Sequence, residues 1–300
     1  MKLNVVCLDN SVELIEPQRT IPKVLTIAGS DPSGGAGIEA DIKTITAMGC
    51  YGMTCIDGIT VQNTMGVYGK YVTDLKTLGQ IMSANFDNDG HIDAIKIGMM
   101  TEAVVQWFKR SYSRGMVKYL VVDPIISSSS GYNLAKMKLV KEAIDNVYLH
   151  ATLLTPNFEE ALKIIDIMGM DRSKYTSKNN MESFCRLAKD IARFTKCRTV
   201  LLKGGHMPIS GINDTELVDI LYDPDNADEF TVFKHCRILG AKNTHGTGCT
   251  LSSAITSCLA LGKSLQEAVE IGTCYVHNAL RFADSGLGKG KGPLNHIYTL

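Results

Sequence analysis

From Lys23 onward, short apolar runs rich in β-branched residues alternate with longer amphipathic stretches. The runs have the length and composition of buried strands. They predict strands at Val24–Ala28, Met53–Val61, Ala94–Ile97, Tyr119–Val122, Thr152–Leu154, Thr199–Leu202, Leu217–Leu221 and Phe230–Phe233. Several runs lack polar alternation, which is typical of a parallel sheet that is covered on both faces.

Between most of these runs, apolar residues recur at helical spacing. They predict helices at Gly37–Met48, Asp74–Ser83, Glu102–Ser111, Asn133–Asn146, Phe158–Ile167, Met181–Phe194, Gly248–Leu261 and Leu265–Ala283. A repeated strand–helix order implies right-handed crossovers and a doubly wound α/β sheet. The last two strands follow one another directly, so we predict an antiparallel hairpin at that edge. We expect an irregular leader over 1–22 and one domain over 23–300, because no Ser- or Pro-rich linker divides the sequence.

Composition narrows the classes of function. Hydrophobic residues make up 45% of the 300 positions and charged residues 21%, which are globular proportions. Basic and acidic residues number 31 each, so the sequence gives no global electrostatic reason to bind nucleic acid or an anionic membrane. No apolar run approaches the ~20 residues of a membrane span, and the first residues resemble no targeting peptide. We therefore expect a cytoplasmic protein. The nine scattered cysteines form no C-x-x-C pair, which argues against a disulfide framework or a zinc site.

Two glycine-rich segments stand at strand-to-helix junctions, where free helix N–H groups attract anions. The first spans Gly29–Gly37 and contains a G-x-G-x-x-A match that begins at Gly35. The residues that separate this match from the preceding strand, Asp31 among them, argue against a dinucleotide fingerprint. No Walker P-loop fits the sequence.

The second segment, Thr244–Cys249, leads into a helix of small residues. Gly246 and Gly248 leave consecutive N–H donors unobstructed, which suits a site for developing negative charge. Cys249 follows in the first helical turn, where the helix dipole is expected to lower the pKa of its thiol and favour the thiolate. From this loop alone, a packing cysteine beside a tight turn is an equal alternative.

These two segments belong to a set of motifs that occur in one order along the chain. They are Ala28-Gly-Ser-Asp-Pro-Ser-Gly-Gly-Ala-Gly-Ile-Glu-Ala-Asp41, Gln62-Asn-Thr64, Lys96-Ile-Gly-Met99, Val121-Val-Asp-Pro124, Thr155-Pro-Asn-Phe-Glu-Glu160, Leu202-Lys-Gly-Gly-His206 and Asn243-Thr-His-Gly-Thr-Gly-Cys-Thr250. Together they resemble the hydroxymethylpyrimidine/phosphomethylpyrimidine kinases of thiamine biosynthesis, within the ribokinase-like superfamily, from about Lys23 to Asn295. The resemblance implies a ribokinase-like three-layer α/β/α sandwich with a mostly parallel central sheet, ATP as donor, Mg²⁺ and a homodimer.

The implied reaction is phosphorylation of 4-amino-5-hydroxymethyl-2-methylpyrimidine, and then of its monophosphate. The resemblance places Cys249 as the base that takes the hydroxyl proton, with Gly246, Thr247 and Gly248 forming an anion hole. The second step starts from an ionised phosphate, so we expect it to need no base.

The resemblance implies substrate contacts from residues at strand ends and in the first loop, namely Gln62, Asp41, Gly29, Ala36, Met99 and Ile125. Gln62 suits this role because an amide offers one acceptor and one donor to an amino group beside a ring nitrogen. For Asp41 the alternative is helix capping, and for Met99 it is ordinary core packing.

On the nucleotide side, the resemblance implies ATP contacts from Asn157, Lys203, Gly205, Thr244 and Thr247, and metal contacts from Asp123 and Glu160. Asn157 and Glu160 suit water-mediated magnesium binding, and the same pair would form a helix capping box. Asp123 and Lys203 follow buried strands, where an unpaired charge is costly.

Two positions depart from the family pattern. The family commonly carries a lysine in the loop after Pro124, whereas this sequence has Ser127–Ser130. Asp57 stands where family members usually have a small neutral residue, and its carboxylate must be paired or solvated. Two alternatives remain open: a pyridoxal kinase of the same superfamily, and a catalytically silent paralogue that binds the pyrimidine.

Overall fold

The computed structural model describes residues 20–87, 91–126, 136–176, 180–205, 213, 215–225 and 229–299. Within them lies one sheet of nine strands in the order β3-β2-β1-β4-β5-β6-β7-β8-β9. The strands are β1 (Lys23–Ser30), β2 (Tyr51–Asn63), β3 (Gly66–Val72), β4 (Ala94–Ile97), β5 (Tyr119–Val122), β6 (Leu153–Leu154), β7 (Thr199–Lys203), β8 (Glu216–Asp223) and β9 (Glu229–Cys236).

The centre of the sheet is parallel and both edges are antiparallel. Strands β2, β1, β4, β5, β6 and β7 run in one direction, while β3 reverses beside β2 and β8 reverses beside β7. The predicted hairpin of the last two strands is confirmed as β8 and β9. The predicted fold class, a mostly parallel α/β sandwich, is confirmed with it.

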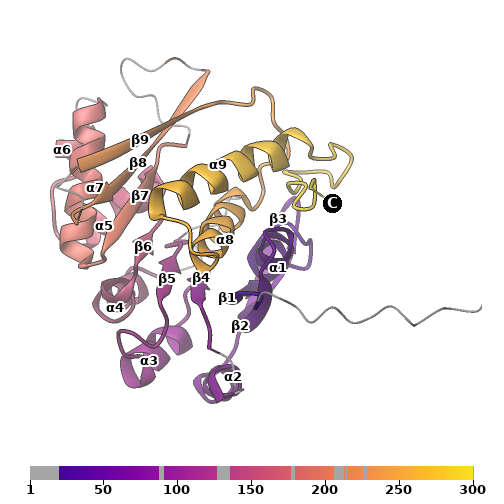
Figure 1. Ribbon diagram of the computed structural model, residues 1–300. Helices are drawn as coiled ribbons and strands as arrows, with labels where there is room; N and C mark the ends of the chain where they lie inside the picture. Colours follow the sequence, from indigo (N-terminus) through magenta and orange to yellow (C-terminus); the bar gives the residue numbers. More distant parts are fainter. Residues whose placement is uncertain are drawn as a thin grey trace, which may run out of the picture.

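Helices cover both faces of the sheet (Figure 1). One face carries α1 (Gly37–Ala47), α8 (Thr247–Ala260) and α9 (Leu265–Arg281). The opposite face carries α2 (Leu75–Asp87), α3 (Glu102–Ser111), α4 (Met137–Asn146), α5 (Phe158–Ile167) and α7 (Met181–Thr195), over the larger apolar core, and a short helix α6 (Ser173–Thr176) precedes α7. The sheet is therefore enclosed, which explains why its central strands read as unbroken apolar runs.

Local signals set where the helices begin. The Thr101 side chain accepts from the backbone of Val104 at the start of α3, and Asn180 caps α7 in the same way. Ser264 and Glu267 form a reciprocal capping box at the start of α9. Each cap satisfies backbone donors that a helix leaves unpaired in its first turn.

The sequence analysis did not predict β3, because apolar side chains of this strand are exposed. Tyr68 and Tyr71 are exposed, so the segment does not follow the pattern of a half-buried strand. Helix α4 begins at Met137, and the predicted start at Asn133 lies outside the described residues. The leader over 1–19 and the Ser127–Ser130 segment also lie outside them.

In the described part of the chain, every helix is too short or too polar to cross a membrane. This finding agrees with the absence of a long apolar run in the sequence.

Ile220 of β8 and Val232 of β9 test the placement of these strands, because they face each other across the ladder. Ile220 has no exposed surface, whereas Val232 is 39% exposed. We expect Ile220→Ala to lower the free energy of unfolding by about 2–5 kcal/mol, because it leaves a cavity, and Val232→Ala to lower it by less than about 1 kcal/mol. Urea unfolding midpoints at unchanged m-value measure both. Equal losses would contradict an edge position for β9.

Candidate functional site

The predicted site residues gather where the parallel strands end. Gln62 lies near the end of β2, Met99 follows β4, Asp123 follows β5, and Lys203 ends β7. Because these strands are parallel, their carboxyl ends share one edge of the sheet, which is where open α/β sheets bind ligands. The N-termini of α1 and α8 lie above the same edge.

The two glycine-rich loops touch each other through their backbones. A Cβ atom on Gly246 would overlap the carbonyl oxygen of Gly35, and Gly246 has a φ of +86°. Only glycine combines this backbone angle with so close an approach. The loop before α8 therefore seats directly on the loop before α1.

Cys249 lies between the starts of these two helices. Gly246 is the N-cap of α8 and has no side chain, so no side chain caps the first amides of the helix. The backbone N–H of Gly37, the first residue of α1, acts to lower the pKa of the Cys249 thiol. The start of α8 thus offers free N–H groups beside the thiol, as the anion hole of Gly246 to Gly248 requires.

The predicted thiolate character of Cys249 is wrong for this structure. The pKa of the Cys249 thiol is raised to about 11, mainly by burial and also by the negative charges of Asp41 and Asp123, while Lys96 opposes them. The helix dipole was expected to dominate, but desolvation of a side chain only 7% exposed outweighs it. Cys249 therefore keeps its proton near neutral pH.

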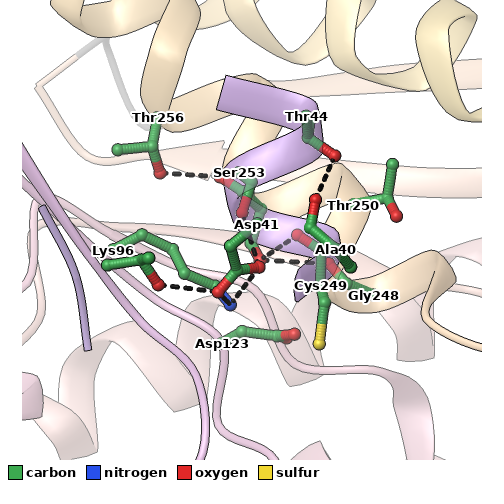
Figure 2. A network of polar contacts seen from close by, with 12 residues as sticks. Ala40, Asp41, Thr44, Lys96, Asp123, Gly248, Cys249, Thr250, Ser253 and Thr256 are labelled. Atoms are coloured by element: carbon green, nitrogen blue, oxygen red, sulfur yellow. Dashed lines mark hydrogen bonds and ion pairs between the residues drawn. The ribbon is translucent and has the colours of Figure 1, made fainter. Parts of the chain in front are cut away.

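A buried ion pair lies beside Cys249 (Figure 2). Nζ of Lys96 lies 2.8 and 2.7 Å from the two carboxylate oxygens of Asp41, and neither side chain has exposed surface. Thr26 and Ser253 each donate a further hydrogen bond to this carboxylate, at 2.6 and 2.8 Å. Burial would lower the pKa of Lys96, but Asp41 outweighs that effect and holds it above its usual value.

This network corrects both interpretations of Asp41. The carboxylate does not line an open pocket, since it is fully buried and engaged by three side chains. It does not cap α1 either, because the N-cap is Ala36 and no side chain bonds there. Asp41 instead holds the charged side chain of Lys96 in place beside the thiol of Cys249.

A second ion pair marks the nucleotide side. Nζ of Lys203 donates to Oδ1 of Asp123 at 3.0 Å, and the hydroxyl of Thr155 donates to the same oxygen. A Cβ atom on Gly248 would lie 3.2 Å from Oδ2 of Asp123 and 3.5 Å from Nζ of Lys203. The start of α8 therefore faces this pair directly.

Asn157 and Glu160 form the capping box of α5. The Asn157 side chain accepts from the backbone of Glu160, and the Glu160 carboxylate accepts from the backbone of Asn157, both at 2.9 Å. Asn157 also forms an isolated bridge with Lys203. The capping box that was predicted as the alternative role of Asn157 and Glu160 is confirmed. One carboxylate oxygen of Glu160 takes no part in this cap.

Asp123 and Glu160 fit a magnesium ion that phosphates and water complete. The pKa of Glu160 is raised to about 7, mainly by burial, which Lys203 opposes and nearby Asp123 reinforces. Among the described residues, no three His, Cys, Asp or Glu side chains gather closely enough to hold a metal unaided. Two carboxylates with phosphate oxygens are the usual protein environment of Mg²⁺.

The substrate side brings Gly29, Met99 and Gln62 to the same edge of the sheet. A Cβ atom on Gly29 would lie 2.6 Å from Cε of Met99, so the thioether packs on the first loop. Nε2 of Gln62 lies 3.0 Å from Nε2 of His245, in the second loop. The same imidazole nitrogen lies 2.7 Å from Oδ2 of Asp31.

The remaining predicted site residues lie in described parts of the chain but make fewer contacts with other site residues. The backbone N–H of Ala36 donates to the carboxylate of Asp31, and that of Ile125 donates to the carbonyl of Asp123. Thr244 is half-buried beside His245, and Gly205 is exposed after β7. No ligand contact of these residues is tested by the structure.

Sequence reasoning gave no role to His245, Asp31 or Lys96, although each stands inside a quoted motif. Their partners are more than fifty positions away in the chain, so spacing alone could not pair them. The usable signal was a charged or imidazole side chain within an otherwise small-residue loop for Asp31 and His245, and a charged side chain within an apolar strand for Lys96.

The chain matches the phosphomethylpyrimidine kinase family over residues 31–295. It is 39% identical over 285 residues to the hydroxymethylpyrimidine/phosphomethylpyrimidine kinase THI21 of Saccharomyces cerevisiae, covering 93% of this chain and 50% of that protein. The chain thus spans about half the length of this and several other curated relatives.

Two solved structures show the same fold. The phosphomethylpyrimidine kinase of Clostridium difficile 630 is 37% identical with a TM-score of 0.68, covering 86% of this chain and 99% of that one. The pyridoxal kinase of Staphylococcus aureus in complex with ADP is 26% identical with a TM-score of 0.77, covering 94% and 95%. The ordered motifs, the sheet and these similarities agree: the chain belongs to the phosphomethylpyrimidine kinase family.

Proposed function

We propose that this protein transfers a phosphoryl group from ATP to the hydroxymethyl group of 4-amino-5-hydroxymethyl-2-methylpyrimidine, and then phosphorylates the monophosphate. The observation that carries this proposal is the uncapped start of α8, where Cys249 and free N–H groups face the Lys203–Asp123 pair. Phosphoryl transfer requires positioning and charge neutralisation, and this arrangement supplies both.

The nucleotide side would hold the phosphates of ATP. Burial would lower the pKa of Lys203, but Asp123 outweighs it and raises that pKa, so the ammonium stays charged. Lys203 would bind phosphate oxygens, together with Gly205 after β7, Thr244 before α8, and the helix-start residues Asn157 and Thr247. Asp123 and Glu160 would hold Mg²⁺, which when bound neutralises phosphate charge.

The substrate side would orient the hydroxymethyl group toward the start of α8. Gln62 would bind the amino and ring-nitrogen edge, Met99 would cover a face of the ring, and Gly29, Ala36 and Ile125 would complete the wall. Cys249 would then lie beside the hydroxyl, as a base for the first step. With a thiol pKa of about 11, roughly one molecule in 10⁴ carries the thiolate at pH 7.

Pyridoxal phosphorylation is the second candidate. The S. aureus pyridoxal kinase superposes on this chain with a TM-score of 0.77. Its 26% identity is lower than the 37–39% of the pyrimidine kinases, which favours the pyrimidine. Parallel assays of the two substrates with ATP and magnesium separate these functions, and preference for pyridoxal would overturn the proposal.

We further propose a homodimer formed through the outer face of β2 and β3. Ile59 and Tyr71 are directly opposed on this ladder and exposed, and Val61, Tyr68 and Val72 nearby are exposed as well. An apolar edge hairpin of this kind is a hazard unless it is covered. A second copy offers the same surface and can close a two-fold contact.

Replacing Cys249 separates the two phosphorylation steps. We expect Cys249→Ala to slow phosphorylation of the alcohol at least about 100-fold, the lower range for losing a general base, and to slow phosphorylation of the monophosphate far less. A coupled assay that follows both products over time measures the two rates. Cys258→Ala, a buried thiol on the same helix, is the matched control. Equal losses in both steps would contradict a base role.

The pH dependence of the first step follows from the raised thiol pKa. Because the folded-state pKa is about 11, the thiolate fraction increases about tenfold per pH unit below it. We expect the rate constant of alcohol phosphorylation to rise with pH from 7 to 10, whereas that of monophosphate phosphorylation stays nearly flat over this range. Initial rates at saturating substrate measure both. A flat profile for the alcohol would mean that Cys249 acts without losing its proton.

The proposed dimer predicts that a charge placed in the interface lowers the molar mass of the protein in solution. We expect wild-type protein to elute with twice the mass of one chain in size-exclusion chromatography with light scattering, and Tyr71→Glu to shift it toward one chain, because a buried charge opposes association. Leu239→Glu, at an exposed apolar residue outside the hairpin, should keep the wild-type mass. A monomeric wild type would refute the interface.

A further inference from the structure

His245 joins three segments that are distant in the sequence. Its imidazole Nε2 lies 2.7 Å from Oδ2 of Asp31, in the loop after β1, and 3.0 Å from Nε2 of Gln62, near the end of β2. His245 itself lies in the loop before α8 and is 9% exposed. One ring nitrogen therefore contacts both the first loop and the residue expected to bind the substrate.

The ring is held firmly in this position. A Cβ atom on Gly35 would lie 2.5 Å from Cδ2 of His245 and 3.1 Å from Cβ of Pro293, so the loops pack tightly around the imidazole. The backbone N–H of His245 donates to the carbonyl of Gly292 at 3.1 Å. The imidazole cannot turn away from its two partners without moving these loops.

Asp31 determines which imidazole nitrogen carries a proton. Its carboxylate accepts from the backbone and hydroxyl of Ser33 and from the backbone of Ala36. Burial would raise the pKa of Asp31, but the hydrogen bonds from His245 and Ser33 outweigh it and lower that pKa. An ionised carboxylate only accepts hydrogen bonds, so at 2.7 Å Nε2 of His245 must donate.

A protonated Nε2 has no lone pair left for the Gln62 amide. An –NH₂ group 3.0 Å from it would set two donors against each other. Turning the amide by 180° brings Oε1 to this place without changing the shape of the side chain. The hydrogen bonds are then satisfied, because Nε2–H of His245 is shared between Asp31 and Oε1 of Gln62.

We propose that His245 is a positioning residue for substrate selection, which holds Gln62 with Oε1 on its own side and the –NH₂ group turned toward the ring nitrogen of the substrate. The inference rests on the proposed function, since it assigns Gln62 to the pyrimidine. Oε1 keeps a lone pair for the exocyclic amino group, while –NH₂ donates to the neighbouring ring nitrogen. A substrate with the opposite pattern, an oxo group beside a ring N–H, would set its acceptor against Oε1 and its donor against the –NH₂ group.

The discriminating experiment compares the aminopyrimidine with its analogue that carries an oxo group in place of the amino group. We measure kcat and KM for both with the full-length protein. In His245→Leu the amide is free to turn and to accept the oxo analogue. We expect the ratio of the two kcat/KM values to fall at least about tenfold, the value of one hydrogen bond to a well-placed group, through the two KM values rather than kcat.

Two further variants keep the test decisive if His245→Leu does not fold. The side chain of His245→Gln places a donor where Nε2 lies, and that of His245→Asn places it nearer the backbone. We expect His245→Gln to retain the wild-type ratio and His245→Asn to lose it. A purely structural role for His245 would weaken both substrates equally and leave the ratio unchanged in all three variants, which would overturn the inference.

The Gln62 side chain supplies the internal control. Gln62→Leu should lower the ratio with His245 intact, and adding His245→Leu to it should lower the ratio no further, because His245 acts through the amide. An additional loss in the double variant would refute this route. If the wild type turns over neither pyrimidine, the proposed function fails, and the inference with it. If it turns over the aminopyrimidine with a ratio that His245→Leu does not alter, only the inference fails.

Discussion

Two helix N-termini and the ends of several strands can share one site only because the two glycine loops touch backbone to backbone. A Cβ atom on Gly246 would overlap the carbonyl oxygen of Gly35, and one on Gly37 would overlap that of Gly29. Gly246 and Gly37 also have positive φ angles, which other residues adopt at a cost. A side chain on Gly246 would push α8 away from the start of α1, and one on Gly37 would push the start of α1 away from β1. The contact from His245 to Asp31 would then be lost.

Several charged side chains of the site are buried, and the pairing of these charges follows from that burial. Lys96 and Asp41 have no exposed side-chain surface, and Lys203 is paired with Asp123. A buried charge is tolerated only when it is paired and hydrogen-bonded, so each cation keeps its own carboxylate. Desolvation also acts on Cys249, which lies among these charges but has no counter-ion of its own. The same burial raises the pKa of the Cys249 thiol and by itself would lower the pKa values of Lys96 and Lys203, which stay charged because of their carboxylate partners.

The sequence correctly predicted the features that a short stretch of residues determines by itself. Unbroken apolar runs gave the parallel strands, and the ordered motifs gave the residues at the strand ends. It failed where the outcome depends on partners far away in the chain. The role of Asp41 is set by Lys96, the thiol of Cys249 responds to burial that no local pattern reveals, and His245 and Gln62 are 183 positions apart. Strand β3 was missed for a different reason, because its exposed apolar residues do not follow the pattern of a half-buried strand.

Asp57, which departs from the family pattern, lies where the pairing of β1 with β2 shifts beside Met99. The register between β1 and β2 pairs Ala28 with Ile56 and Gly29 with Gly58, so Asp57 is the extra residue of a bulge. Burial raises the pKa of Asp57 to about 8, against the opposing charges of Lys70 and Lys96. The carboxyl group is therefore mostly protonated near neutral pH, and its burial costs less than that of a charge. The bulge brings Gly58, and not a larger side chain, opposite Gly29. A Cβ atom on Gly58 would lie 2.9 Å from Cε of Met99, so the shifted register leaves room for the thioether that is expected to face the substrate ring.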